Sequence, residues 1–175
     1  MIITEKIPEN IGAVCFTGHR ILDRNEFDAS RRMLEHVISE LAARGAKDFY
    51  CGGALGFDTS AELAVLRARG SGEPVRLRLI LPSPDMSKNW SASDSAVLAG
   101  IIRLADSAEY MSGVYSRQAI FERNRALVDR SDLCVAWMKP STRRGGTFFT
   151  VGYAQKRGVP VVNIYPLAGK EQENE

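Results

Sequence analysis

The feature that most constrains the fold is the regular alternation of short apolar runs with segments of helical periodicity. A short, continuous apolar run is typical of a strand that is buried on both faces of a parallel sheet. The segments between the runs repeat their apolar residues every three or four positions, as one face of an α-helix requires. The predicted strands are 11–16, 47–51, 75–81, 108–111, 132–137 and 161–164, and the predicted helices are 27–41, 61–68, 96–104, 116–130 and 147–156.

Strands that alternate with helices at this spacing form βαβ units, and such units build a parallel sheet. The right-handedness of the crossovers then limits the possible topologies. We therefore predict an α/β fold, a Rossmann-like three-layer sandwich with a mostly parallel sheet and helices on both faces. The expected domain covers residues 11–166, with a lead-in at 1–10 and a polar tail at 167–175.

Local signals give finer predictions at the helix ends. Residues 23–25 are interpreted as a polar turn before the first helix. Asp58 or Thr59 is expected to cap the second helix, and Thr59 with Glu62 fits a capping box. Residues 82–92 are predicted to form an irregular loop.

Composition argues against several classes of protein. The chain of 175 residues has a net charge of +2 and no dense basic run, so nucleic acid is not expected as a partner. No apolar run is long enough to span a membrane and no signal-peptide pattern is present, so we expect a cytoplasmic location and no membrane partner. Cys15, Cys51 and Cys134 are isolated residues in strand-like runs, which predicts buried thiols rather than disulfides or a metal site.

Three glycine-bearing junctions between a predicted strand and a predicted helix form the candidate ligand site. Glycine permits close approach of backbone amides, and a helix start supplies unpaired N–H donors, which together suit a phosphate. Because ligands of open α/β sheets bind beyond the carboxyl ends of the strands, the junctions are expected to meet at one edge. A structural turn also explains each junction taken alone, and only their conjunction favours a ligand. The candidate residues are Thr17, Gly18, His19 and Arg20 in the first junction, Gly52, Gly53, Ala54, Gly56 and Asp58 in the second, and Gly145, Gly146 and Thr147 in the third.

Other polar residues are weaker candidates. Asp58 is most simply a helix cap, and a contact to a ribose hydroxyl is its alternative role. Pro82 is expected to frame one wall of the pocket together with Asp85 and Trp90, although packing is the simpler role of Trp90. Asn124 is a minor candidate on the helix over 116–130, where the neighbouring arginines are interpreted as a solvated face.

These segments resemble the YpsA-like family of the SLOG superfamily, which groups the DNA-processing protein DprA with the LOG phosphoribohydrolases. The resemblance covers roughly residues 11–165 and implies a Rossmann-like fold that binds a nucleotide or nucleotide-derived small molecule, such as ADP-ribose, at its glycine junctions. It implies no definite cofactor, and it suggests a homodimer with Phe148 and Phe149 at the interface. The matching segments are the three junctions, Leu81-Pro82 with Trp90, Arg123-Asn124-Arg125 with Val128-Asp129, and Gly145 through Ala154.

One position departs from the pattern of the LOG enzymes, which carry Pro-Gly-Gly-x-Gly-Thr-x-x-Glu. Aligning Gly146-Thr147 with the Gly-Thr of that motif puts Thr150 at the position of the catalytic glutamate. A threonine cannot serve as a general acid or base, so the resemblance leaves enzymatic activity open, with Asp58 and His19 as possible substitutes.

The leading hypothesis is a nucleotide-binding sensor or regulator. The alternative is a nucleotide N-glycosidase or phosphoribohydrolase, and the third hypothesis is single-stranded DNA binding as in DprA, which the near-neutral charge disfavours.

Overall fold

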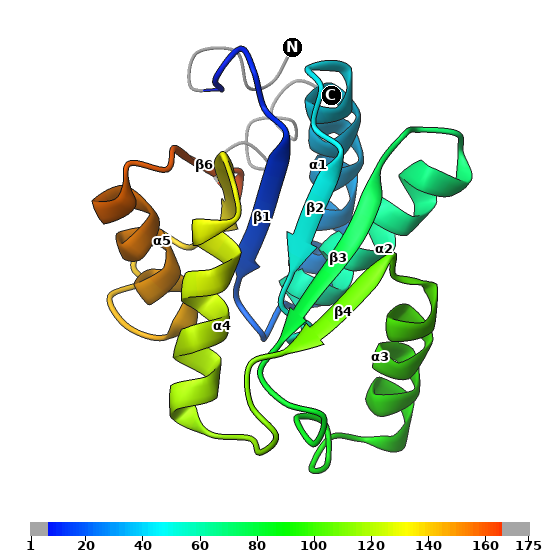
Figure 1. Ribbon diagram of the computed structural model, residues 1–175, viewed down its shortest axis with the longest axis vertical. Helices are drawn as coiled ribbons and strands as arrows, with labels where there is room; N and C mark the ends of the chain where they lie inside the picture. Colours follow the sequence, from blue (N-terminus) through cyan, green and yellow to red (C-terminus); the bar gives the residue numbers. More distant parts are fainter. Residues whose placement is uncertain (1–6, 166–175) are drawn as a thin grey trace.

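The computed structural model describes residues 7–165, and it confirms the predicted α/β fold with a six-stranded sheet and five helices (Figure 1). All pairs of neighbouring strands are parallel. The predicted tail at 167–175 and the first six residues of the predicted lead-in lie outside the described residues. The strands are β1 (Ala13–Gly18), β2 (Asp48–Cys51), β3 (Arg76–Leu81), β4 (Ser107–Tyr110), β5 (Leu133–Trp137) and β6 (Val161–Asn163), and the helices are α1 (Arg24–Ala43), α2 (Phe57–Gly70), α3 (Ala92–Leu104), α4 (Arg117–Asp129) and α5 (Gly146–Arg157).

The strand order β4-β3-β2-β1-β5-β6 contains one reversal of direction. From β1 to β4 the chain adds strands outward on one side, and it then returns to place β5 on the other side of β1. Because parallel crossovers are right-handed, this reversal puts the later helices on the opposite face of the sheet. Figure 1 shows α4 and α5 on one face and α1, α2 and α3 on the other. The switch point of the sheet therefore lies between β1 and β5.

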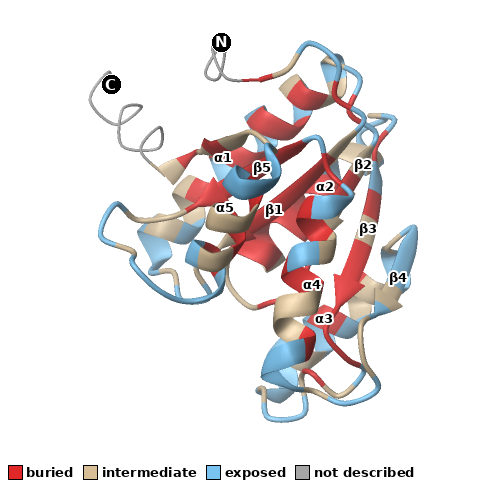
Figure 2. Cartoon of the chain, turned by 60° about the vertical axis from the view of Figure 1, so that its left-hand side comes forward, coloured by how far each residue is buried: buried red, intermediate tan, exposed pale blue. Residues whose placement is uncertain are grey.

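The core fills both faces of the central strands. Every residue of β5 is buried, and so are the four middle residues of β1 (Figure 2). Aromatic rings link the sheet to α2, since Phe57 packs edge-on against Phe16 with ring centroids 6.4 Å apart and stacks on Trp137 at 6.0 Å. This packing fixes the start of α2 against the ends of β1 and β5, where the switch point lies.

Helices α1 and α3 begin earlier than the apolar pattern predicts. Residues 24 and 25, interpreted as part of a turn, form the first turn of α1, because Asp23 and Glu26 make a reciprocal capping box. Helix α3 begins at Ala92, where the hydroxyl of Ser91 accepts a hydrogen bond from the amide of Asp94. In both helices the cap, rather than the first apolar residue, sets the start.

The prediction that Asp58 or Thr59 caps α2 is wrong. The N-cap is Gly56, with a φ of 80°, and the helix begins at Phe57 without a side-chain cap. A side chain at position 56 would place its Cβ 2.4 Å from the carbonyl oxygen of Arg20, so only glycine fits there. The side chains of Asp58, Thr59 and Glu62 instead turn back toward the loop that precedes the helix.

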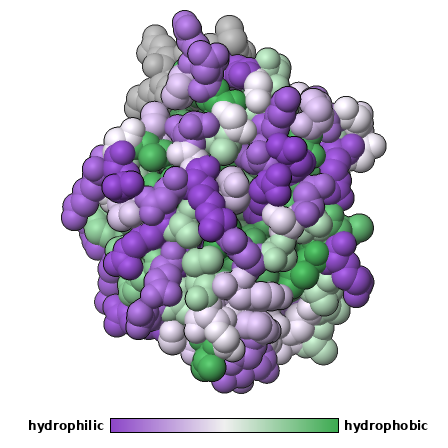
Figure 3. Space-filling model, viewed as in Figure 1, coloured by the Kyte–Doolittle hydropathy of each residue, from purple (hydrophilic) through white to green (hydrophobic). Residues whose placement is uncertain are grey.

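The cysteines, the surface hydropathy and the helix lengths show nothing unusual. Cys15, Cys51 and Cys134 are free and buried, as predicted. Hydrophilic residues cover much of the face seen in Figure 3, and hydrophobic residues lie between them in separate areas. Within the described residues, none of the helices combines the length and the hydrophobicity needed to cross a membrane.

Candidate ligand-binding cleft

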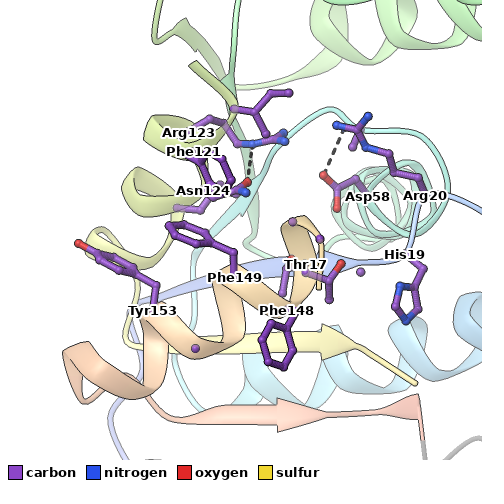
Figure 4. Close-up of a pocket in the computed structure, with 18 of the residues that line it drawn as sticks. Thr17, His19, Arg20, Asp58, Phe121, Arg123, Asn124, Phe148, Phe149 and Tyr153 are labelled. Atoms are coloured by element: carbon purple, nitrogen blue, oxygen red, sulfur yellow. Dashed lines mark hydrogen bonds between the residues drawn. The ribbon is translucent and has the colours of Figure 1, made fainter. Parts of the chain in front are cut away.

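A cleft of about 750 Å³ lies at the carboxyl ends of β1 and β5, at the switch point of the sheet. Its walls come from the end of β1 with the loop after it, the loop after β2 with the start of α2, one side of α4, and the first three turns of α5 (Figure 4). Segments far apart in the sequence therefore meet at this edge because the strands that carry them are neighbours. The volume lies within the range of about 300–1,000 Å³ that is typical of small-molecule sites.

The cleft brings together ten of the fourteen predicted site residues. The ten that line it are Thr17, Gly18, His19, Arg20, Ala54, Asp58, Asn124, Gly145, Gly146 and Thr147. Gly52, Gly53, Gly56 and Pro82 do not line it. Pro82 is buried at the end of β3, and Trp90 packs against the core, as its simpler interpretation predicted.

The three glycines of the second junction are explained by packing. A Cβ at Gly52 would lie 2.2 Å from the guanidinium of Arg123, and one at Gly53 would lie 2.4 Å from the side chain of Leu81. The amide of Gly53 donates to Glu62 Oε1 over 2.9 Å, and the amide of Ala54 donates to Asp58 Oδ2 over 3.2 Å. Because the side chains of Glu62 and Asp58 already accept from these amides, the amides of Gly53 and Ala54 are not open donors toward the cleft.

The start of α5 is the open donor site of the cleft. Its N-cap is Gly145, with a φ of 94°, and no side chain caps the helix. The first amides of a helix have no partner within it and carry partial positive charge. Gly146 and Thr147 place these groups against the cleft. The third junction therefore has the geometry of an anion-binding site.

Asn124 adds a side-chain donor to that helix start. It is 5% exposed, and its Nδ2 lies 3.6 Å from the position that a Cβ at Gly146 would occupy. Its Oδ1 accepts a hydrogen bond of 2.8 Å from Nε of Arg123 (Figure 4). Since Arg123 can only donate, this bond assigns the oxygen and turns the NH₂ group toward α5. No protein acceptor for Nδ2 occurs among residues 7–165.

Arg123 is buried, which contradicts its interpretation as part of a solvated face. Its Nη1 donates to the carbonyl oxygen of Gly52, so that one guanidinium joins α4 to the loop after β2. Arg125 and Arg130 on the same helix are exposed, as predicted. The sequence does contain the signal, because positions 119, 123, 124, 127 and 128 follow the i, i+4 spacing of the buried stripe of α4.

A small group of buried charges lies beneath the second junction. Burial raises the pKa of Asp58 above its usual range, while Arg123, the Ala54 amide, Arg20 and the Gly52 amide oppose that shift. Burial, with the nearby charge of Asp58, raises the pKa of Glu62 much further. Glu62 Oε2 is buried and has no hydrogen-bond partner among the described residues, which fits a neutral carboxyl group. The opposite charges that remain in this group are those of Asp58 and Arg123, which attract each other.

His19 joins the two loops that flank the switch point. Its Nε2 accepts a hydrogen bond of 3.0 Å from the backbone amide of Lys139 and lies 3.2 Å from the hydroxyl of Thr142. Burial, followed by the charge of Lys139, lowers the pKa of His19, and the weaker influence of Glu26 opposes this. The imidazole is therefore neutral at pH 7, with Nε2 as an acceptor, and it holds a loop rather than donating from that nitrogen to a ligand.

The rim of the cleft is cationic and aromatic. Four exposed cations line it, namely Arg20, Arg117, Arg144 and Lys156. Phe149 packs on Phe121 with ring centroids 4.6 Å apart, so it lies within the chain's own aromatic cluster rather than free on the surface. Phe148, the other residue expected at a dimer interface, is 42% exposed and also lines the cleft.

Thr150 does not reach the cleft. It is fully buried, and its hydroxyl donates to the carbonyl oxygen of Gly146 over 2.8 Å within α5. The position that carries the glutamate in LOG enzymes thus supplies no acid or base here. Asp58 is the one carboxylate that lines the cleft within the described part of the chain, where no group of three or more metal-ligating side chains occurs.

Comparisons with known proteins agree with this fold. A family model described as the YspA SLOG family matches residues 14–160. A solved structure of DNA processing protein A from Helicobacter pylori, described for its single-stranded DNA binding mode, aligns with a TM-score of 0.60 and 21% identity over 86% of this chain. The structure of TM1055 aligns with a TM-score of 0.56 and 18% identity, covering 86% of this chain and 72% of that one. At these identities the likeness concerns the fold.

The chain spans 63% of the DNA processing protein A chain that it matches. No curated protein matches it in a sequence search.

Proposed function

The chain belongs to the YspA SLOG family, and from that premise and the geometry of the cleft we propose that it is a nucleotide-binding protein. The ligand class is a phosphorylated nucleoside such as AMP, ADP or an ADP-ribose-like molecule. The protein acts as a sensor or regulator of that ligand. Its buried, unpaired thiols suit a reducing compartment, and we propose the cytoplasm as its location.

The phosphate binds at the start of α5. Backbone amides of Gly146 and Thr147 supply donors at the positive end of the helix, and Arg144 supplies a charge beside them. The observation that carries the proposal is Asn124 Nδ2, a donor on a buried side chain that is oriented by Arg123 toward that helix start. Because Nδ2 has no acceptor among the described residues and faces the cleft, it is available to donate to a phosphate there.

The base lies against the aromatic side of the cleft. Phe148 is exposed there, and Tyr153 and Phe121 line the same wall. Ring stacking on such side chains favours a planar base at a cost of little side-chain entropy. The ligand is thus bound at two ends, by its phosphate at α5 and by its base at the rim.

Hydrolysis of the glycosidic bond is not part of the proposal. The cleft contains no residue at the place of the LOG glutamate, since Thr150 is buried inside α5. A binding role needs no general acid or base.

The test is the variant Asn124→Asp. The substitution keeps an oxygen that accepts from Arg123 Nε, but it replaces the donor next to Gly146 by a carboxylate oxygen that repels a phosphate. We expect the wild type to be stabilised by a nucleotide from a panel of AMP, ADP, ADP-ribose and NAD. A ligand at 100 times its Kd adds about 2.7 kcal/mol, which corresponds to about 5–11 °C in Tm for a chain of this size.

The control is Asn89→Asp, which makes the same chemical change at an exposed position outside the cleft. Asn124→Asp is expected to lose the thermal shift, and Asn89→Asp is expected to keep it. If no nucleotide of the panel stabilises the wild type, or if Asn124→Asp responds as strongly as the wild type, the proposal is wrong.

Single-stranded DNA is the second candidate ligand, and the rim of the cleft favours it. Although the net charge is small, four exposed cations surround one opening, next to the exposed ring of Phe148. A cationic groove with stacking side chains is how single strands are bound without sequence preference. If DNA is the ligand, the affinity for a labelled oligonucleotide falls steeply with salt and is lost in Arg144→Glu. If the wild type and Arg144→Glu bind the oligonucleotide equally well at low and at high salt concentration, single-stranded DNA is excluded as the ligand.

A further inference from the structure

We infer that Asp58 recognises the ribose of the bound nucleotide, so that the cleft selects ribonucleotides over 2′-deoxyribonucleotides. This inference rests on the proposed function and specifies which class of nucleotide the same cleft takes. It also separates the two candidate ligands above, because DNA lacks the hydroxyl that Asp58 would bind.

Asp58 lies at the floor of the cleft in the first turn of α2. It is 6% exposed, yet it lines the cleft, and Figure 4 shows its carboxyl group facing across the cleft toward Asn124. The phosphate site at Asn124 and the carboxylate thus lie on opposite walls. A nucleotide whose phosphate is bound at α5 then has its sugar, the next group along the molecule, within the space that Asp58 faces.

The Asp58 carboxylate has acceptor capacity that the protein does not use. An ionised carboxylate offers about four lone-pair positions, and in Asp58 one oxygen accepts from the Ala54 amide over 3.2 Å. Its position is also influenced by the Gly52 amide and by the charges of Arg123 and Arg20. The remaining capacity is directed at the cleft, and a sugar hydroxyl is a donor that can fill it.

Arg20 and Asp58 together are complementary to a hydroxyl group. Its guanidinium lies beside the carboxyl of Asp58 at the cleft (Figure 4). A hydroxyl group donates one hydrogen bond and accepts others, so it can donate to Asp58 while it accepts from Arg20. A phosphate is a poor match for the same place, because it would face the only carboxylate among the described residues that line the cleft.

A 2′-deoxynucleotide leaves the buried carboxylate without its donor. A hydrogen bond to a charged group contributes about 1.5–3 kcal/mol, and a site built for a hydroxyl rejects the analogue that lacks it. At about 1.4 kcal/mol for each factor of ten, the expected loss of affinity is about tenfold to 100-fold.

The experiment is isothermal titration of the full chain with ADP and with 2′-deoxy-ADP. The wild type is expected to bind ADP at least about tenfold more tightly. In Asp58→Asn, which keeps an oxygen for the Ala54 amide, the affinity for ADP should fall and the ratio of the two affinities should approach one. Asp94→Asn makes the same change at an exposed position of α3 and should leave the ratio as in the wild type.

The outcomes separate the two proposals. Equal affinity of the wild type for ADP and 2′-deoxy-ADP overturns the ribose inference and leaves nucleotide binding intact. Failure of the wild type to bind either nucleotide overturns both. The comparison on the wild type decides the inference even if Asp58→Asn does not fold, because it needs no variant.

Discussion

Replacing Arg123 by methionine removes the one guanidinium that holds three parts of the cleft together. Methionine keeps the length and much of the volume of the side chain but has no donors and no charge. Three interactions are lost: the bond from Nη1 to the Gly52 carbonyl, the bond of 2.8 Å from Nε to Asn124 Oδ1, and the attraction to the Asp58 carboxylate. All the groups left behind are buried.

The expected cost follows from that burial. Leaving a buried charge without its compensating opposite charge costs about 3–5 kcal/mol. An acceptor left unsatisfied in the interior costs about 1–3 kcal/mol, and the Gly52 carbonyl is one such group. These costs overlap, since part of the first is relieved when Asp58 takes up a proton. We expect Arg123→Met to lower the free energy of unfolding by about 3–5 kcal/mol, or about 6–20 °C in Tm.

The assay is urea unfolding followed by circular dichroism, with the slope of the transition checked for constancy between variants. The matched control is Arg130→Met at the end of the same helix, where the arginine pairs with Glu109 and is 42% exposed. An exposed pair contributes about 0–1 kcal/mol, so this control should be nearly as stable as the wild type.

A double variant tests the cause of the loss. Arg123→Met combined with Asp58→Asn removes both charges, and it should be more stable than the sum of the two single effects predicts. The reasoning is refuted if Arg123→Met costs no more than Arg130→Met, or if the costs of Arg123→Met and Asp58→Asn simply add.

Two further predictions concern the loops around the cleft. Because the pKa of His19 is lowered in the folded state, the unfolded chain binds a proton at a higher pH than the folded protein does. The contribution of His19 to the free energy of unfolding should therefore be complete above pH 6.5 and decrease as the pH falls through the lower folded pKa. Urea titrations from pH 8 to pH 5 should show this decrease in the wild type and a smaller one in His19→Gln, and identical pH profiles would contradict the prediction. Gly18→Ala should destabilise the protein by about 1–3 kcal/mol, because its Cβ would lie 2.4 Å from the Phe57 ring. In Gly152→Ala, in α5, the added Cβ meets nothing within 4 Å, and this variant should be about 0.5–1 kcal/mol more stable than the wild type. Thermal unfolding of the two alanine variants gives the comparison, and equal melting temperatures would refute the prediction.

The general position of the site could be predicted from the sequence for a topological reason. The three junctions follow β1, β2 and β5, and parallel strands that are neighbours in a sheet bring their carboxyl ends together. Apolar runs identify the strands, so the predicted fold alone was enough to place Thr17, Asp58 and Gly146 at one edge of the sheet. The caps of α1 and α3 were harder to predict from the sequence, because the same few polar residues can form either a helix cap or a turn.

The sequence did not show which polar groups form hydrogen bonds with each other. Gly53 and Ala54 looked like open amides because nothing local shows that Glu62 and Asp58 fold back to accept from them. The burial of Arg123 was hidden for a similar reason, because its acceptor on Gly52 is 71 residues away in the sequence. Periodicity reports which face of a helix is covered, but the partner that makes a buried charge acceptable comes from another element of the fold.

The links between the loops have a consequence for the thermodynamics of recognition. His19 and Asn163 both hold the segment that follows β5, through the amide of Lys139 and through the amide and carbonyl of Met138. Lys139 is also paired with Glu26 of α1 over 2.6 Å. A segment held at these points has little conformational entropy left to lose when a ligand arrives. The loop that leads to the start of α5 is therefore anchored where it begins, and ligand binding to the cleft should show little of the unfavourable entropy that accompanies the ordering of a mobile loop.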